Sequence, residues 1–410
     1  KIVTGIPATE FTRAVREDLV RPGLLYAATE RSMYISYDAG EHWQSLKRNL
    51  PPVSVHDIAL RDDDLVIATM GRGFYAMENI SSLRQADQVN RSAGAYLYKP
   101  GVSYRSAGTV KAEYWLAGPG QAVTLEILDA KGKVLQKASS TDTVAAAGGR
   151  GGRGGGGGGR GGRGGAAAPT RVTTEGGLNS YDLSLRYPDG VNFRGAIYWS
   201  GNGLNGPNGP PGTYTVRMTV GSGTPQTQTV KVMTDPRIKA SDADVTEQFN
   251  FLIRIRDTVS AANNAVRTIR NVRYQMNDVR AKFSGEQVAA FETASKALND
   301  SLTNIEVELY QTKNEAGQDP LNYPIRLNNQ IGALSGFVSS SERRPPQQAY
   351  DVWNTLVPQL NMQLLRLKRQ LSTQLPKVNA ALKAAGQPEI VPSTDELGAA
   401  PGGRGGRGGL

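Results

Sequence analysis

The hydrophobic period of the sequence changes near Ser241, and this change constrains the fold more than any other feature. Before Ser241, apolar and polar residues alternate in short segments, the pattern of half-buried β-strands. The clearest case is residues 210–220, where one face carries Tyr214, Val216, Met218 and Val220. After Ser241, apolar residues recur at spacings of three and four, the pattern of helices packed on a core. The sequence therefore predicts a multidomain β plus α fold, with strands first and helices last.

Residues 1–88 contain short β segments at even spacing, each followed by its own turn. We predict strands over 23–29, 32–38, 55–60, 64–69 and 73–80. The opening residues, KIVTGIP, are interpreted as an outer strand whose partners lie upstream. Such spacing is typical of β-propeller blades. Only about two blades fit in this length and a propeller ring needs more. We therefore expect 1–88 to be the last blades of a propeller, with its upstream portion as a partner.

Residues 94–235 carry about seven further β segments, enough for an immunoglobulin-like β-sandwich. The predicted strands are 109–116, 122–128, 133–139, 179–187, 195–200, 210–220 and 227–233. A Gly/Arg-rich stretch at about 143–170 interrupts them, and its composition predicts a disordered loop.

Residues 241–386 are predicted to form an antiparallel four-helix bundle, with long first and last helices. Capping-box sequences at Ser241 and Ser284 indicate two helix starts. Arg256 interrupts the apolar stripe of the first helix. The stripes are interpreted as core rather than as a cofactor cavity, because the Glu-x-x-His pairs of metal-binding bundles are absent, and we expect no cofactor. The Pro/Gly-rich tail, 387–410, is predicted to be disordered.

The formal charge of +10 is concentrated in two Gly-rich tracts. Removing their six arginines leaves 10 − 6, or +4, so the remainder is only mildly basic. The tract GGRGGRGGGGGGRGGRGG (148–165) could bind RNA through its arginines, but no aromatic residue interleaves to stack on bases. Composition therefore favours a low-complexity loop over a nucleic-acid module.

The chain has no cysteine and two histidines, which excludes disulfides and thiolate chemistry. His42 and His56 are fourteen residues apart without a pattern of acidic ligands, so we predict no metal site. The RDDD run (61–64) lacks calcium-loop spacing and is interpreted as a solvated hairpin turn. No apolar run is long enough to cross a bilayer.

The stretch SYDAGEHW, residues 36–43, has the composition of a tight turn. Asp38 can accept backbone N–H bonds across the turn, Gly40 can take a positive φ, and Trp43 can pack beneath. Ser36 completes the pattern S-x-D-x-G-x-x-W. No second carboxylate or base converges on Asp38 in the local sequence, so a structural role is favoured over a catalytic one.

SYDAGEHW resembles the Asp-box, or BNR repeat, of sialidase-like propellers, with His42 where Thr is usual. The region VREDLVRPGLLYAATERSMYISYDAGEHW to MGRGFYAMENI is similar to the last blades of bacterial Vps10/sortilin-type repeat proteins, often labelled "glycosyl hydrolase". The sandwich and helical segments resemble the C-terminal regions of the same proteins. Met70 stands where the family commonly has His before Gly-Arg-Gly. The resemblance implies an exported protein with a large N-terminal propeller.

Three residues are candidates for binding rather than for catalysis. Arg72 lies between two glycines in a predicted turn and could present its guanidinium at a propeller face. Tyr198 and Trp199 precede an Asn/Gly-rich stretch that could recognise a sugar or a partner. The alternative interpretation, which we favour, places Trp199 in the sandwich core.

We therefore expect no catalytic site in this chain. The predicted function is non-catalytic protein or glycan binding, or scaffolding, at the envelope of a bacterium, in the periplasm, on the cell surface or outside the cell. One alternative is a glycoside hydrolase whose active site lies in the upstream propeller, because fold alone does not establish chemistry. The other is RNA binding through the Gly/Arg-rich tracts.

Overall fold

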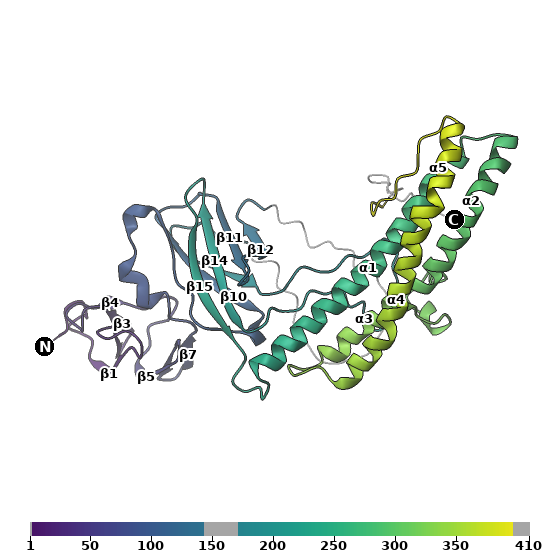
Figure 1. Ribbon diagram of the computed structural model, residues 1–410. Coiled ribbons are helices and arrows are strands. Elements are labelled where there is room, and N and C mark those ends of the chain that lie inside the picture. Colours follow the sequence, from purple (N-terminus) through teal and green to yellow (C-terminus); the bar gives the residue numbers. More distant parts are fainter. Residues whose placement is uncertain (1, 143–170, 397–410) are drawn as a thin grey trace, which may run out of the picture. The chain divides into compact units, whose positions relative to one another are not determined.

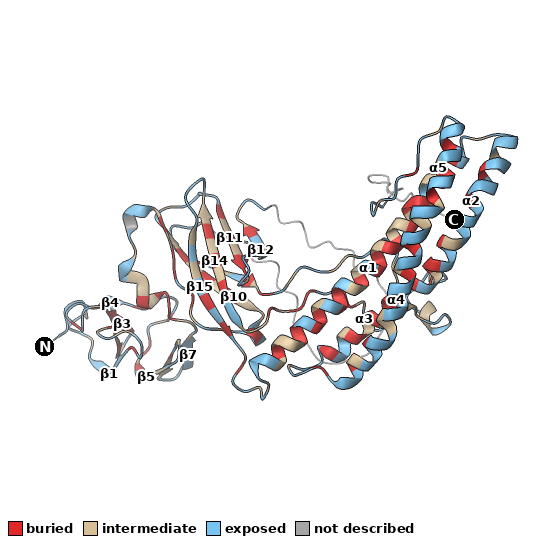
Figure 2. Ribbon diagram, in the orientation of Figure 1, coloured by how far each residue is buried: buried red, intermediate tan, exposed pale blue. Residues whose placement is uncertain are grey.

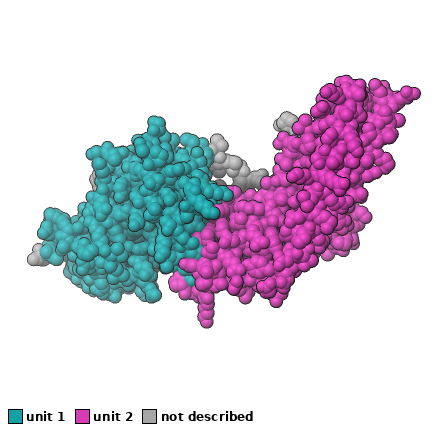
Figure 3. All heavy atoms as spheres, viewed as in Figure 1, with its two compact units in different colours: residues 1–148, 164–186, 211–235 teal, residues 149–163, 187–210, 236–410 magenta. Residues whose placement is uncertain are grey.

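The computed structural model of the 410-residue chain describes residues 2–142 and 171–396, and they form two compact units. The β unit contains residues 2–142, 171–186 and 211–235 (Figure 3). The helical unit contains residues 187–210 and 236–396. The predicted class, β plus α with a C-terminal helical region, is confirmed (Figure 1). The predicted loop at 143–170 and the last residues of the tail lie outside the described residues.

The β unit begins with two small antiparallel sheets that share one hydrophobic cluster. The first sheet has the order β1-β2-β3-β4, and the second has the order β5-β6-β7. Their bounds are β1 Thr12–Glu17, β2 Leu25–Thr29, β3 Met33–Ser36, β4 Gln44–Ser45, β5 Val55–Arg61, β6 Asp64–Thr69 and β7 Gly73–Met77. The five predicted strands of this region are all present. The prediction of a strand at KIVTGIP was wrong, because residues 2–7 contain a turn at Thr4–Gly5 and no strand, and the outer strand is β1.

Two larger sheets follow, of three strands in the order β13-β10-β8 and five in the order β12-β11-β14-β15-β9. Their bounds are β8 Ala95–Leu97, β9 Ser103–Tyr104, β10 Thr109–Leu116, β11 Val123–Leu128, β12 Val134–Ser139, β13 Gly177–Ser184, β14 Gly212–Val220 and β15 Gln226–Met233. Pairing is antiparallel except between β15 and β9. Alternation determines the faces as predicted, since every second residue of β10 is buried, and Tyr214, Val216 and Met218 of β14 are buried.

The strand predicted at 195–200 is absent, and residues 187–210 belong to the helical unit rather than to the sandwich segment 94–235. Side chains from helices satisfy the backbone of this segment in place of a sheet. Asn329 accepts from the Trp199 N–H at 2.7 Å and donates to the Trp199 carbonyl at 2.8 Å. Asn263 donates to the carbonyl of Val191 at 2.8 Å. The β-favouring residues Ile197, Tyr198 and Trp199 therefore lie in a loop with helical partners.

The helical unit has five α-helices around one hydrophobic cluster, where four were predicted. Their bounds are α1 Asp242–Arg280, α2 Glu286–Leu309, α3 Leu327–Val338, α4 Gln347–Thr373 and α5 Leu375–Ala384. The predicted last helix is divided at Gln374. Pro376, in the first turn of α5, has no N–H to donate to the carbonyl of Ser372, so the ladder of backbone hydrogen bonds is interrupted there. Figure 2 shows the buried stripe along α1 that the three-and-four spacing predicts.

The two predicted helix starts differ in outcome. The capping box at Ser241 is present, with the Ser241 hydroxyl and the Asp244 side chain each bonded to the other's backbone N–H. The prediction at Ser284 was wrong, because the N-cap of α2 is Gly285, at a φ of 55°, without a side-chain cap. Arg256, expected to interrupt the α1 stripe, is buried and donates to the Pro188 carbonyl at 2.7 Å.

The tail prediction for 387–410 was wrong for its first ten residues. Ile390 is buried in the helical core, and its backbone exchanges two hydrogen bonds with Asn379. Gln275 of α1 does the same with Val391. We call residues 389–396 the C-terminal strap. Separately, none of the helices in the described ranges has the length and apolar character to cross a membrane.

A close backbone approach fastens residues 187–210 to α3. A Cβ on Gly332 would lie 2.6 Å from the Asn202 carbonyl oxygen, and a Cβ on Gly203 would lie 2.6 Å from the Gly332 Cα. Gly203 also has a φ of +65°, which other residues adopt only with strain. Only glycine fits at either position.

We predict that Gly332→Ala destabilises the helical unit by about 1–3 kcal/mol, because backbone has to move to admit the methyl group. Gly336→Ala is the matched control on the same helix, since a Cβ there meets no atom within 4 Å. It should stabilise by about 0.5–1 kcal/mol through helix propensity. Thermal unfolding followed by circular dichroism at 222 nm measures both, and equal effects of the two variants would contradict the close contact.

Candidate binding cleft

The predicted Asp-box residues form a self-bonded turn after β3. The Ser36 hydroxyl donates to Asp38 Oδ1 at 2.8 Å and accepts from the Gly40 N–H at 2.9 Å, where Gly40 has a φ of 95°. Asp38 also accepts from the His42 backbone N–H at 2.9 Å. These bonds, first that backbone N–H, then the Ser36 hydroxyl and the His42 side chain, lower the pKa of Asp38 to about 2. Trp43 is buried against Ala27 and Tyr34.

Asp38 also belongs to a small exposed group of potential metal ligands. Its Oδ2 lies 2.7 Å from His42 Nδ1, and one carboxylate oxygen of Glu41 lies within 4.8 Å of both ligand atoms. Among the described residues this is the one group of three or more such side chains. His56, the other histidine considered in the sequence, is exposed on β5 and is not part of it.

The three predicted binding residues are not brought together, because they belong to different units. Arg72 is exposed in the β6–β7 turn between Gly71 and Gly73, both at positive φ. Tyr198 donates to Asn263 Oδ1 at 3.1 Å, and burial raises its pKa to about 12. Trp199 has its backbone fixed by Asn329 and is 40% exposed as a residue, so the prediction of a sandwich-core Trp199 was wrong.

The β unit instead contains a cleft of about 740 Å³ that sequence reasoning did not find. Five carboxylates line it, and the set is Asp62, Asp63, Asp64, Glu78 and Asp182. Exposed apolar surface lies beside them, from Val20, Val102, Tyr104 and Met233. The RDDD run is therefore the β5–β6 turn, as predicted, but it also forms an acidic cleft wall.

The five carboxylates differ in their partners. Asp182 lies opposite Lys111 in the β10–β13 register, where opposite charges attract. Asp63 is paired with Arg84. Asp62, Asp64 and Glu78 are exposed and make no ion pair within the described part of the chain, although Asp64 accepts from the Asn79 N–H at 3.0 Å. The cleft thus offers three carboxylates to a ligand.

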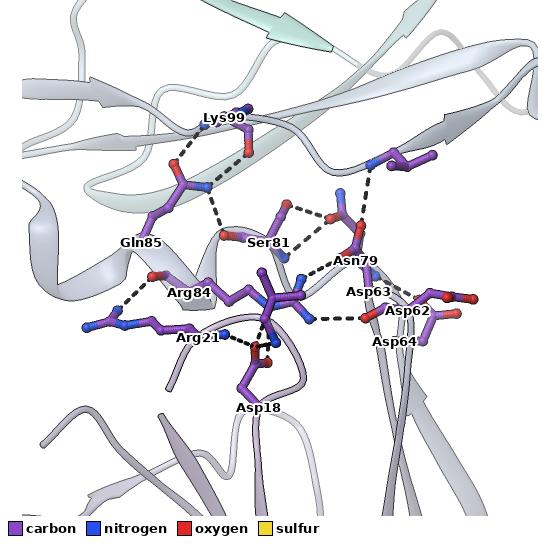
Figure 4. A network of polar contacts seen from close by, with 12 residues as sticks. Asp18, Arg21, Asp62, Asp63, Asp64, Asn79, Ser81, Arg84, Gln85 and Lys99 are labelled. Atoms are coloured by element: carbon purple, nitrogen blue, oxygen red, sulfur yellow. Dashed lines mark hydrogen bonds and ion pairs between the residues drawn. The ribbon is translucent and has the colours of Figure 1, made fainter. Parts of the chain in front are cut away.

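A buried arginine fixes the acidic wall of the cleft (Figure 4). Arg84 lies in the 3₁₀ helix Leu83–Gln88 and is 9% exposed. Its Nε donates to both oxygens of Asp18, at 2.8 and 3.0 Å, and its other nitrogens bond Asp63 Oδ1 and the Asp62 carbonyl. One guanidinium therefore joins the turn after β1 to the β5–β6 turn.

Asp18 is the buried anion of this network. Burial acts to raise the pKa of its carboxyl, but the backbone N–H groups of Arg21 and Val20, together with Arg84, outweigh burial and lower it. Tyr26 donates to the second oxygen at 3.2 Å. Every oxygen of this carboxylate is bonded, which is the condition for keeping a charge out of water.

The segment after the 3₁₀ helix is fastened to the same wall (Figure 4). Gln85 exchanges two 3.0 Å hydrogen bonds with the backbone of Lys99, and the Val102 N–H donates to Asp63 at 3.3 Å. Gly101 passes so close that a Cβ there would lie 2.7 Å from both Asp63 and Asn79. These contacts place Val102 and Tyr104 across from the carboxylates.

We predict that Arg84→Gln destabilises the β unit by about 3–5 kcal/mol, because it leaves the Asp18 carboxylate buried without its cation. Arg16→Gln is the matched control. It removes an ion pair with Asp57 whose side chains are 48% and 61% exposed, and it should cost less than about 1 kcal/mol. Chemical denaturation followed by tryptophan fluorescence compares them, and similar losses would refute the role of Arg84.

We also predict an acid-sensitive contribution from Asp18. Because folding lowers the pKa of Asp18, its contribution is present above the ordinary aspartate pKa of 3.8 and is lost as pH falls through the lower value in the folded state. Asp18→Asn should therefore lower the unfolding midpoint near neutral pH, and its difference from the unsubstituted chain should shrink below pH 3.8. A difference that stays constant down to the acid limit would contradict this.

No protein-family model matches the chain, and no curated protein matches it. Among solved structures it is similar to a biofilm associated protein (BSP domain), at 13% identity, with a TM-score of 0.19 and coverage of 52% of this chain and 27% of that one. It is also similar to the extracellular domain of a one-component system of B. thetaiotaomicron, at 8% identity, with a TM-score of 0.16 and coverage of 56% of this chain and 26% of that one. Dimeric latent PorU from Porphyromonas gingivalis is similar at 12% identity, with a TM-score of 0.19 and coverage of 57% of this chain and 17% of that one. The chain thus spans about a quarter or less of these structures, and scores this low identify neither fold nor function.

Proposed function

We propose that this chain is a non-catalytic part of an exported bacterial protein, and that its β unit binds a basic segment of another protein of the cell envelope. The observation that carries the proposal is the cleft of about 740 Å³, where three carboxylates form no ion pair with any described residue and lie beside exposed apolar side chains. Lysine and arginine side chains satisfy both surfaces, because their charged ends pair with carboxylates while their methylene stems cover apolar groups.

The finer architecture supports the same proposal. We interpret the two small sheets as blades of a sialidase-like propeller, because each is an antiparallel meander in chain order. The larger sheets are interpreted as an immunoglobulin-like sandwich, and the helices as a bundle. On this interpretation the cleft lies where the last blade meets the sandwich, and the upstream blades of the same protein are a further partner.

Binding is favoured over catalysis by the state of the carboxylates in the cleft. A catalytic pair needs two acids whose environments drive their pKa values apart. Asp62, Asp64 and Glu78 are exposed, while Asp63 is held by Arg84 and Asp182 lies opposite Lys111. The Gly/Arg-rich tracts considered for RNA binding lie outside the described residues.

We predict that a photo-crosslinking residue placed at Tyr104 in the native host captures an envelope protein, and that the double variant Asp62→Asn with Glu78→Gln weakens this capture about tenfold. Both changes keep the side-chain shape, and Asn tolerates the φ of 52° at position 62. The control is Glu41→Gln with Glu175→Gln, which removes the same charge from exposed positions of the β unit outside the cleft.

The crosslinked residue of the partner should lie in a segment rich in lysine or arginine, and capture should fall as salt rises. Equal capture by the cleft and control variants would refute the cleft as the binding site. Saturable binding of a neutral glycan at the cleft would replace the basic segment with a sugar ligand. Hydrolysis of a polysaccharide panel that depends on these carboxylates would refute the non-catalytic function.

A further inference from the structure

A second cavity, of about 350 Å³, lies within the helical unit, and three arginines reach it. Arg267 and Arg270 extend from one face of α1, because they are three residues apart. Arg194 comes from the 187–210 segment, next to Phe193. Asp395 and Glu396, at the end of the C-terminal strap, complete the lining. We call this cavity the arginine pocket.

Arg270 forms a satisfied wall of the pocket. Its Nε donates to Glu306 Oε1 at 2.8 Å, and its guanidinium lies 4.8 Å from the ring centre of Phe193 and 5.6 Å from that of Tyr310. Aromatic faces attract a cation, and they also limit its movement. Arg270 is therefore already paired with a carboxylate and with two rings.

Arg267 has an unmet hydrogen bond. Its Nε is buried and has no hydrogen-bond acceptor among the described residues. The nearest carboxylate oxygen, Glu396 Oε1, is 3.8 Å away, which is within range of Coulomb attraction but beyond a hydrogen bond. A buried donor without an acceptor is unfavourable, and more so when it is charged. Arg267, which lines the pocket, thus carries a donor that no described residue satisfies.

Arg194 supplies a second cation at the mouth. Its side chain is exposed and makes no hydrogen bond or ion pair within the described residues. Its backbone N–H donates to Glu396 Oε1 at 2.8 Å. The Glu396 carboxylate thus bonds the backbone of Arg194 and leaves both the Arg194 guanidinium and Arg267 Nε without a close acceptor.

We propose that the arginine pocket binds a small oxyanion between Arg267 and Arg194, in competition with the Glu396 carboxylate. Guanidinium groups bind carboxylate and phosphate oxygens through paired, charge-assisted hydrogen bonds. The oxyanion accepts from the buried Nε of Arg267, and Arg194 closes over it from the mouth.

The Glu396 side chain can move out of the arginine pocket while the C-terminal strap stays attached to the helices. Asn271 holds the Asp395 carbonyl at 2.9 Å, and Gln275 and Asn379 hold the backbone of Val391 and Ile390. None of these bonds involves the Glu396 side chain. The pocket can therefore exchange an internal carboxylate for an external oxyanion while the helical core stays folded. This site lies in the helical unit and stands or fails independently of the cleft in the β unit.

The test titrates the full chain with sodium acetate and, separately, with inorganic phosphate, at an ionic strength held constant with sodium chloride. Isothermal titration calorimetry gives the Kd. Arg267→Gln should weaken binding about tenfold or more, because one charge-assisted pair is lost. Glu396→Gln should strengthen binding severalfold, because the internal competitor loses its charge. Arg369→Gln, which removes an exposed charge from α4, is the control and should leave the Kd unchanged.

A purely structural Arg267–Glu396 pair predicts the opposite for Glu396→Gln, namely lower stability and no gain in anion affinity. The proposal is overturned if neither anion binds saturably to the unsubstituted chain or to the Glu396→Gln chain. It is also overturned if Arg369→Gln weakens binding as much as Arg267→Gln does. Should Arg267→Gln fail to fold, the exposed Arg194→Gln replaces it, with the same expected loss. A preference for acetate or for phosphate identifies which oxyanion the site accepts.

Discussion

The guanidinium of Arg84 is the interaction on which the β unit depends. It is buried, and it pairs with a buried aspartate in the turn after β1 and with a second aspartate in the β5–β6 turn. Bringing these charges out of water is unfavourable unless every donor and acceptor is matched, and here the backbone and Tyr26 complete the set. Such a network tolerates one arrangement of its members. It therefore fixes the relative positions of the turn after β1 and the β5–β6 turn, which no strand pairing connects.

In the helical unit, side chains of the helices form hydrogen bonds with the backbone of a long loop, residues 187–210. Residues 187–210 form no strand beyond an isolated bridge at Asn208, yet they contribute buried residues such as Phe193 and Leu204 to the helical core. Amides on the helices, chiefly Asn263 and Asn329, provide the donors and acceptors that strand neighbours would otherwise give. Each asparagine is itself buried, and this is stable only because the loop saturates its amide.

Periodicity predicted much of the fold because the faces of β10, β14 and α1 are determined by local alternation or spacing. It failed at Tyr198 and Trp199, which are residue types common in strands. Tyr198 is bonded to Asn263, 65 positions away, and Trp199 is bonded to Asn329, 130 positions away. Proline alone does not locate the α4–α5 break, because Pro358 lies inside α4 whereas Pro376 lies just after the break. The Ser284 cap failed because Gly285, at positive φ, takes the cap position. The Asp18–Arg84 pair, 66 residues apart, carries no local signal, so neither the network nor the cleft could be derived from the sequence.

The division of the chain between its two units has a consequence for how the protein can be taken apart. The polypeptide passes from the β unit to the helical unit at residue 187, returns at 211 and leaves again at 236. Neither unit is therefore a continuous stretch of gene. Expression from residue 236 onward would strip the helices of the Gly203 backbone that packs on α3 and of Phe193 in their core. Expression ending at 235 would release a free 24-residue segment of that core into solvent. Each unit has a core of its own, yet a single cut in the chain cannot separate the two units without dividing one of them.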